Sequence, residues 1–157
     1  THHDQKFAKE DAVAMTMKFA NSAIGSFVLS DRTPTPWTWE MALGENSKFP
    51  KSGQNAIRFM GTKGALEFPN LVLWSHSDLE GNWQDEIRSE VIEMPFVDAY
   101  VEQCQHLCAV VQGTQMPIID AENGTRSLDA TLAAVRAATE GTRVILDLSS
   151  YQDRKIY

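Results

Sequence analysis

The stretch Ala-Val-Ala-Met-Thr-Met-Lys-Phe at residues 12–19 alternates strictly between two kinds of side chain. Its valine, its two methionines and its phenylalanine fall on one side, while small or polar residues fall on the other. A period of two over eight residues is typical of a β-strand with one apolar face. Residues 24–31 resume as a second strand after a short turn, so the two segments predict a β-hairpin.

The same strand-like pattern continues through the middle of the chain. We predict further strands at residues 37–43, 55–60, 65–68, 71–75 and 86–94, and a last strand at 142–148. The turn Gly61-Thr62-Lys63-Gly64 joins two of these strands, and we expect its glycines to adopt positive φ, which costs glycine nothing sterically. The segment 86–94 is rich in charge and is expected at a sheet edge, where charge discourages aggregation.

Near the end of the chain the apolar period changes to three and four residues, which indicates amphipathic helices. We predict helices at residues 98–112 and 121–140. Asp98 is a suitable N-cap for the first helix, and Gly113 and Gly141 suit the left-handed position that follows a helix.

This order of elements, strands first and helices last, indicates an α+β fold. We expect a single domain over residues 1–157, with a polar tail at 149–157. Its architecture would be an open-faced, mostly antiparallel sheet of six or seven strands with the two helices packed on one face. The other face would still carry large apolar side chains, such as Phe27, Leu29, Val72 and Trp74. A half-apolar face left bare is usually an interface, so we expect this domain to dock against another copy or another domain.

Composition excludes several classes of partner. The chain has 157 residues, 43% of them hydrophobic, and a formal charge of −7 without a segment rich in Lys and Arg. Nucleic acid and anionic membranes are therefore unsuitable partners, and no apolar run approaches the ~18 residues of a membrane-spanning helix. Cys104 and Cys108 lie one helical turn apart and are expected to be reduced core residues. Because the first residues contain no apolar signal segment, we expect a cytoplasmic protein.

Sequence motifs for catalysis, cofactors or metals are missing. Gly61 and Gly64 lie between strands rather than at a strand-to-helix turn, so they do not form a dinucleotide fingerprint. His106 lies about 200° around the predicted helix from Cys104, so these residues and Cys108 cannot share one metal ion. We therefore predict no catalytic residue, no cofactor site and no metal site within this chain.

The loop at residues 30–40 is the strongest candidate for ligand binding. Arg32, Trp37, Trp39 and Glu40 place a cation, two indoles and a carboxylate in a segment stiffened by two prolines. Rings beside hydrogen-bonding groups suit a sugar or polyol, which offers an apolar face and hydroxyls. We predict that these four residues bind substrate. The alternative is that the tryptophans are core residues of a strand and that Arg32 is solvated.

A series of short motifs then follows in a set order. These are Glu10-Asp11-Ala12-Val13, Phe19-Ala20-Asn21-Ser22-Ala23-Ile24-Gly25-Ser26, Ser30-Asp31, Pro36-Trp37-Thr38-Trp39-Glu40, Ile57-Arg58-Phe59-Met60-Gly61-Thr62-Lys63-Gly64-Ala65-Leu66, Leu73-Trp74, Gln103-Cys104-Gln105-His106-Leu107, Val110-Val111-Gln112-Gly113 and Ala133-Ala134-Val135-Arg136-Ala137-Ala138-Thr139-Glu140-Gly141. Because these motifs occur together in this order, the chain resembles the C-terminal domain of the Gfo/Idh/MocA oxidoreductases, the family of glucose–fructose oxidoreductase and inositol dehydrogenase. The resemblance extends from about residue 9 to residue 148.

The resemblance implies an enzyme with two domains. An N-terminal Rossmann domain, absent from this chain, would bind NAD or NADP, and the C-terminal sheet would shape the substrate site and form a homo-oligomer interface. The family's catalytic lysine lies in the N-terminal half, and its aspartate and histidine partners lie upstream of this chain. His2 and His3 do not fall in that motif. We therefore carry over no catalytic residue and expect the isolated chain to be inactive.

Our first hypothesis is a substrate-binding and oligomerisation domain of an NAD(P)-dependent oxidoreductase that acts on a sugar, cyclitol or related polyol. Two alternatives remain open. One is an NAD-dependent glycosidase of the same family, which oxidises a sugar transiently to allow elimination. The other is a stand-alone α+β binding or scaffold module without catalysis.

Overall fold

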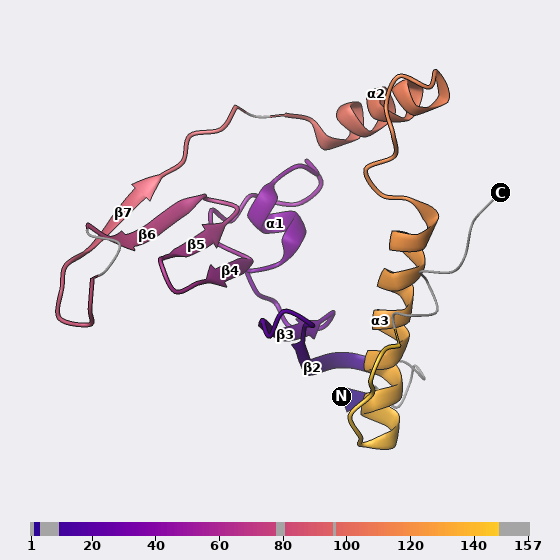
Figure 1. Cartoon of the computed structure of the whole chain (residues 1–157), viewed down its shortest axis with the longest axis horizontal. Coiled ribbons are helices and arrows are strands. Elements are labelled where there is room, and N and C mark those ends of the chain that lie inside the picture. The colour runs from indigo at the N-terminus through magenta and orange to yellow at the C-terminus, as the bar shows by residue number, and fades with distance from the viewer. Residues whose placement is uncertain (1, 4–9, 78–80, 96, 148–157) are drawn as a thin grey trace. The chain divides into compact units, whose positions relative to one another are not determined.

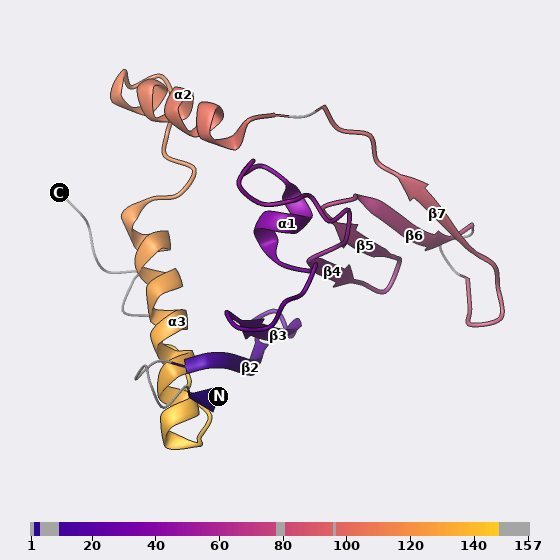
Figure 2. The ribbon, with the colours of Figure 1, turned by 180° about the vertical axis from the view of Figure 1, so that it is seen from behind.

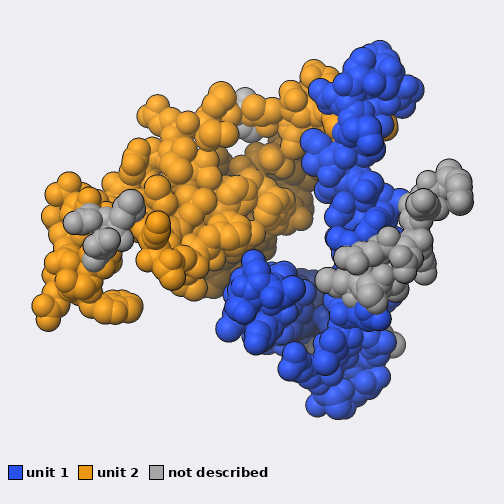
Figure 3. Space-filling view, in the orientation of Figure 1, with its two compact units in different colours: residues 1–33, 109–157 blue, residues 34–108 orange. Residues whose placement is uncertain are grey.

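A computed structural model describes residues 2–3, 10–77, 81–95 and 97–147 of the chain (Figure 1). The chain divides into two compact units, which Figure 3 shows in different colours. One unit contains residues 1–33 and 109–157, and the other contains residues 34–108.

The first unit holds a three-stranded antiparallel sheet in the order β1-β2-β3. Its strands are β1 (His2–His3), β2 (Glu10–Lys18) and β3 (Ile24–Ser30). The long pair β2 and β3 confirms the predicted hairpin, and its turn is closed by a 2.9 Å hydrogen bond from Phe19 N–H to the carbonyl of Ala23.

The register of this hairpin gathers its large apolar side chains on one face. Val13 pairs with Leu29, and Met15 pairs with Phe27, so the four side chains share a face with Met17. The opposite face carries mainly alanine, serine, threonine and lysine. We call the five apolar residues the hairpin apolar face.

The second unit holds a four-stranded antiparallel sheet in the order β4-β5-β6-β7, seen from both sides in Figures 1 and 2. Its strands are β4 (Ile57–Met60), β5 (Ala65–Phe68), β6 (Val72–His76) and β7 (Ile87–Val91). The charged strand β7 lies at one edge, as predicted.

The α+β class and the open antiparallel sheets are confirmed, but the strands are divided between two sheets rather than joined in one. A further difference concerns residues 142–148, which were predicted to form a last strand. Residues 142–147 pair with no strand among the described residues, and residue 148 lies outside them. The predicted polar tail at 149–157 also lies outside the described residues.

The prediction of a strand at 37–43 was wrong, because Trp39–Leu43 forms the short helix α1. Thr38 caps its start by accepting a hydrogen bond from Met41 N–H at 3.2 Å. Gly44 ends it in the left-handed conformation, with φ at 70°. These two caps provide hydrogen-bond partners for backbone groups that an isolated helical turn would leave without partners. They therefore favour a helix, although the side chains of residues 37–43 alternate as in a strand.

The two long helices match their predicted positions. Helix α2 spans Ala99–Val111, and helix α3 spans Ala121–Glu140. Asp98 accepts hydrogen bonds from the first backbone N–H groups of α2, at 3.0 and 3.2 Å. Gly113 and Gly141 both adopt the left-handed conformation that was expected after each helix.

The turn between β4 and β5 forms as predicted, with Gly61 N–H donating to the carbonyl of Gly64 at 2.9 Å. Neither glycine has a positive φ, so that expectation was wrong. A Cβ at Gly64 would instead lie 2.6 Å from the backbone oxygen of Trp74. Glycine is needed here for the close approach of two backbones.

Burial is limited in both units. Among the described side chains, those less than a tenth exposed belong to Ala42, Ala133 and Asp11. Cys104 and Cys108 are free and exposed, so the prediction that they belong to a core is wrong. Both cysteines lie on the apolar face of α2, and two other residues of that face, Tyr100 and Leu107, are exposed as well. Each unit thus presents apolar surface that its own described residues do not cover.

Candidate functional site

The bend after β3 is shaped by its own hydroxyl groups. Ser30 Oγ lies 2.9 Å from Thr33 Oγ1 and accepts a hydrogen bond from Arg32 N–H at 3.3 Å. Asp31 N–H donates to the backbone carbonyl of Asp11 on β2 at 3.2 Å. Serine and threonine side chains commonly hold turns in this way, so the bend presents Arg32 from a defined backbone.

Arg32 is tied to β2 by an ion pair. Its Nη1 atom lies 3.2 Å from Oδ2 of Asp11. The Asp11 side chain is 9% exposed, whereas that of Arg32 is 57% exposed. A carboxylate this buried requires a charged partner, and Arg32 provides one while much of its side chain faces solvent.

The segment after the bend belongs to the second unit and leads into α1. Thr35 Oγ1 accepts a hydrogen bond from Trp37 N–H at 3.1 Å, and Ser52 donates to the carbonyl of Pro36 at 2.7 Å. Together with the Thr38 cap, these bonds hold the two tryptophans at the start of a helix. The alternative that the tryptophans are core residues of a strand is therefore wrong.

The two indoles differ in their surroundings. Trp37 is 63% exposed, and no ring contact involves it among the described residues. Trp39 is 51% exposed, and its ring centroid lies 5.7 Å from that of Phe68 on β5. Trp39 therefore anchors α1 on its sheet and exposes only part of its ring, whereas Trp37 offers more open aromatic surface.

Glu40 lies in the first turn of α1, where it is exposed. A carboxylate at this position interacts favourably with the helix dipole, so Glu40 has a structural reason to be here. The predicted substrate residues thus fall into two groups. Trp37, Trp39 and Glu40 share one short segment, while Arg32 belongs to the other unit.

Sequence reasoning missed Asp11 as part of this region. It appeared only as one residue of the motif at the start of β2, and 21 positions separate it from Arg32. The available signal was an acidic residue beside an otherwise apolar strand, which becomes informative only when its partner is known.

The turn Gly61–Gly64 borders a shallow depression of about 630 Å³, lined by Phe59, Lys63, Leu66 and Leu73 among others. The turn joins β4 to β5 and does not precede a helix. It therefore lacks the strand-to-helix geometry on which a dinucleotide's phosphates are bound, and the residues here do not fit that cofactor. Among the described residues, no group of three or more His, Cys, Asp or Glu side chains could hold a metal ion.

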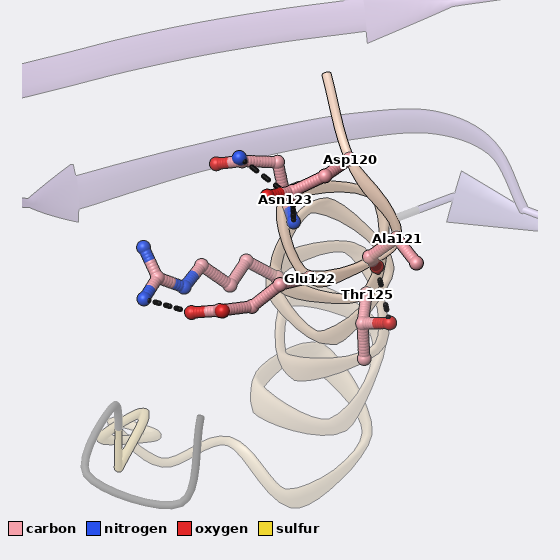
Figure 4. Close-up of polar contacts among 6 residues, drawn as sticks. Asp120, Ala121, Glu122, Asn123 and Thr125 are labelled. Atoms are coloured by element: carbon pink, nitrogen blue, oxygen red, sulfur yellow. Dashed lines mark hydrogen bonds and ion pairs between the residues drawn. The ribbon is translucent and has the colours of Figure 1, made fainter. Parts of the chain in front are cut away.

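A further polar cluster lies at the start of α3, where Figure 4 shows Asp120 bonded to Asn123. The backbone N–H of Asn123 donates to Asp120 at 2.8 Å and is the main reason why the pKa of this carboxyl is below its ordinary value of 3.8. Glu122 forms an ion pair with Arg126 one turn further along. These contacts cap and stabilise the helix, so the cluster is structural.

Comparison with known proteins identifies the family of this chain. The family model described as "Oxidoreductase family, C-terminal alpha/beta domain", that of Gfo/Idh/MocA, matches residues 1–146. No curated protein and no solved structure matched the chain. In the part of the chain that the structure describes, no helix has both the length and the apolar character required to cross a membrane. Because the match covers nearly the whole sequence and agrees with the α+β fold, the chain belongs to the Gfo/Idh/MocA oxidoreductase family, as its C-terminal alpha/beta domain.

Proposed function

We propose that this chain is the substrate-binding and oligomerisation domain of an NAD(P)-dependent oxidoreductase that acts on a sugar, cyclitol or related polyol. The family match over residues 1–146 carries this proposal. Hydride transfer requires that the donor and acceptor carbons be held in near-attack geometry. In our proposal this domain forms one wall of the pocket and the N-terminal Rossmann domain forms the other.

In our proposal the N-terminal domain, and not this domain, binds the dinucleotide. The Gly61–Gly64 turn supports this assignment, because it does not fit a dinucleotide's phosphates. When bound there, NAD(P) would accept or supply the hydride. The residues of this chain would bind and orient the polyol and exclude water, without a proton-transfer role of their own.

Within this domain we assign substrate contact to Arg32, Trp37, Trp39 and Glu40. Trp37 would stack on the C–H face of the substrate, since its ring is exposed and its backbone is held by Thr35. Arg32 and Glu40 would donate to and accept from substrate hydroxyls. Trp39 would contribute the part of its ring that does not face Phe68.

We also propose that the domain forms a homo-oligomer through the hairpin apolar face. Leu29 is 55% exposed and Phe27 is 37% exposed, although both belong to the apolar side of their sheet. A contiguous apolar surface of this kind is typical of an interface. The exposed free thiols of Cys104 and Cys108 fit a reducing compartment, which supports a cytoplasmic location.

The substrate assignment is tested with Trp37→Ala in the full-length protein that carries this domain. We expect kcat/KM for polyol oxidation to fall by about fivefold, since one stacking contact with an aromatic ring is worth on the order of 1 kcal/mol. Trp39→Ala should lower both kcat/KM and thermal stability, because Trp39 also contacts Phe68.

The matched control is Trp83→Ala. Trp83 is fully exposed, so its removal deletes an indole of the same unit without loss of packing. Its kcat/KM should equal that of the unaltered protein. Unchanged KM and kcat in both Trp37→Ala and Trp39→Ala would reject the assignment of this loop to the substrate.

A further inference from the structure

The position of the Trp37 indole depends on its backbone. Trp37 is 63% exposed, and no ring contact holds it among the described residues. A ligand that stacks on a freely moving ring must immobilise it, and the conformational freedom lost in this way lowers the affinity. The groups that hold the backbone of Trp37 therefore affect how well its ring can bind a ligand.

The peptide group between Pro36 and Trp37 is held at both of its polar atoms. Its N–H, which belongs to Trp37, donates to Thr35 Oγ1 at 3.1 Å. Its carbonyl, which belongs to Pro36, accepts a hydrogen bond from Ser52 Oγ at 2.7 Å. The first bond is local, whereas 16 positions separate Ser52 from Pro36. The bond from Ser52 therefore joins this peptide group to the loop that follows α1.

Ser52 is itself fixed beside helix α1. The chain that follows the helix folds back toward it (Figure 1), and Ser52 N–H donates to the carbonyl of Met41 at 2.8 Å. The hydroxyl oxygen of Ser52 also accepts a hydrogen bond from Gln54 N–H at 3.2 Å. A serine hydroxyl has one proton to donate, and this proton is directed at Pro36. The side chain of Ser52 is therefore a structural link rather than a donor for a ligand.

These contacts connect Ser52 to both ends of the segment that carries the two indoles. Pro36 comes directly before Trp37. Met41 comes two residues after Trp39, within α1. The hydroxyl and the backbone N–H of Ser52 bond to the carbonyls of Pro36 and Met41, so one residue closes the whole segment. All of these residues belong to the second unit.

We propose that Ser52 is a positioning residue for substrate binding: through its bond to the Pro36 carbonyl it holds Trp37 in the orientation that stacks on the C–H face of a polyol. The proposal rests on the proposed function, in which Trp37 contacts the substrate. Ser52 acts through Trp37 and does not touch the substrate. Because a ring that is oriented in advance loses less freedom on binding, removal of this bond should weaken binding rather than the hydride step.

The first test measures KM and kcat in the full-length protein, with glucose, galactose and myo-inositol as substrates. Ser52→Ala should raise KM by about threefold and leave kcat unchanged, because stacking stabilises the ground state and the transition state alike. This effect is smaller than the one expected for Trp37→Ala, since the ring is displaced rather than deleted. When Trp37→Ala is already present, Ser52→Ala should have no further effect on kcat/KM, because two residues that act through one contact are not additive.

The second test follows the Trp37 ring without any substrate. The full-length protein is labelled with 5-fluorotryptophan, and the fluorine resonance of Trp37 is identified as the one that Trp37→Phe removes. Ser52→Ala should narrow this resonance and shift it toward that of free fluorotryptophan, because the ring gains fast motion. The resonance of Trp74, on β6 of the same unit, should not change. An equal change at Trp74 would indicate a general loss of structure and would overturn the proposal.

Two variants separate the hydrogen bond from the mere loss of a side chain. Ser52→Thr keeps the hydroxyl and should retain both the KM and the Trp37 resonance of the unaltered protein. Ser47→Ala removes an exposed hydroxyl from the same loop and should change neither quantity. If Ser52→Ala does not fold, Ser52→Cys takes its place, because a thiol is a weaker donor and should give a smaller change in the same direction.

The two tests have separate outcomes for this inference and for the proposed function. An unchanged Trp37 resonance in Ser52→Ala or Ser52→Cys overturns the inference, and so does an equal change in Ser47→Ala or a loss of the unaltered signal in Ser52→Thr. Additive losses of kcat/KM with Trp37→Ala, or a lower kcat at constant KM, overturn it as well. If the protein binds NAD(P)H but oxidises none of the three substrates, the proposed function is rejected and the substrate role of Ser52 is rejected with it. If it oxidises them while the resonance is unchanged, the inference alone is rejected.

Discussion

Gly64 illustrates how a single residue can be required for a reason that its sequence context does not reveal. The sequence places it in a glycine-containing turn, where positive φ is the usual explanation for glycine. Its φ is not positive, and the constraint is instead the backbone oxygen of Trp74, 2.6 Å from the position of a Cβ. Trp74 pairs with Ala65 on the adjacent strand, so the constraint arises only when β5 and β6 associate.

We predict that Gly64→Ala destabilises the chain by about 1–3 kcal/mol, since the added methyl must push two paired backbones apart. Gly61→Ala is the matched control, because a Cβ there would meet its nearest heavy atom at 3.5 Å, an ordinary contact. That control should be neutral or slightly stabilising, since alanine restricts the unfolded chain. Free energies of unfolding from urea titration measure both effects, and equal values for the two variants would contradict the prediction.

Asp11 and Arg32 show the same limitation for an ion pair. The sequence singled out Arg32 because it stands among indoles and prolines, but it did not connect Arg32 to Asp11. The connection depends on the register that places Ala12, the neighbour of Asp11, opposite Ser30, which lies two residues before Arg32. Register is a property of two strands together, so a local pattern in either strand does not specify it.

Among the elements, α1 and α3 mark the two extremes of what local sequence predicts. Helix α3 has twenty residues, a capping aspartate and a terminal glycine, and its bounds were predicted correctly. Helix α1 has five residues, over which alternation and helical spacing are hard to distinguish. Its helical state depends on the Thr38 cap, on Gly44 and on the contact of Trp39 with Phe68.

The N-terminus of α3 provides a prediction for pH dependence. The folded-state pKa of Asp120 is lowered, so its ionised form stabilises the helix above the ordinary value of 3.8, and this contribution is lost as the pH falls through the lowered pKa. Asp120→Asn keeps a capping acceptor but cannot ionise. We expect the stability difference between the unaltered chain and this variant to shrink below about pH 4.

Thermal unfolding followed by far-ultraviolet circular dichroism from pH 7 to pH 3 measures this difference. Asp129→Asn, in the middle of the same helix, is the control for the loss of a carboxylate away from the cap. If Asp120→Asn follows the unaltered chain in parallel at every pH, the helix cap does not titrate as described.

At the scale of the whole molecule, the exposed apolar surface is the main feature to explain. In the part of the chain that the structure describes, large apolar side chains remain exposed in both units. The family of this domain implies an N-terminal partner domain that could cover part of such surface, and we propose further copies of the chain as a second kind of partner. The hairpin apolar face is our candidate for the second kind.

We predict that Leu29→Lys weakens self-association of the full-length protein at least tenfold, because a charge placed in an apolar interface must be desolvated. Val28→Lys is the matched control. Val28 is the next residue on β3, is 81% exposed and points to the opposite face. Light scattering across a concentration series distinguishes the two variants. A monomeric unaltered protein at high concentration, or equal dissociation of both variants, would count against this interface.

Local sequence was sufficient for the hairpin β2–β3, for strand β5 and for helices α2 and α3. Their periods, caps and turns act within a few residues, so they are readable without knowledge of the rest of the chain. Three-dimensional contacts decided the division of strands into two sheets, the helical state of α1, the need for glycine at position 64 and the pairing of Asp11 with Arg32. Each of these depends on groups brought together by strand register or helix–sheet packing, and such long-range contacts leave no periodic signal in the segments that make them.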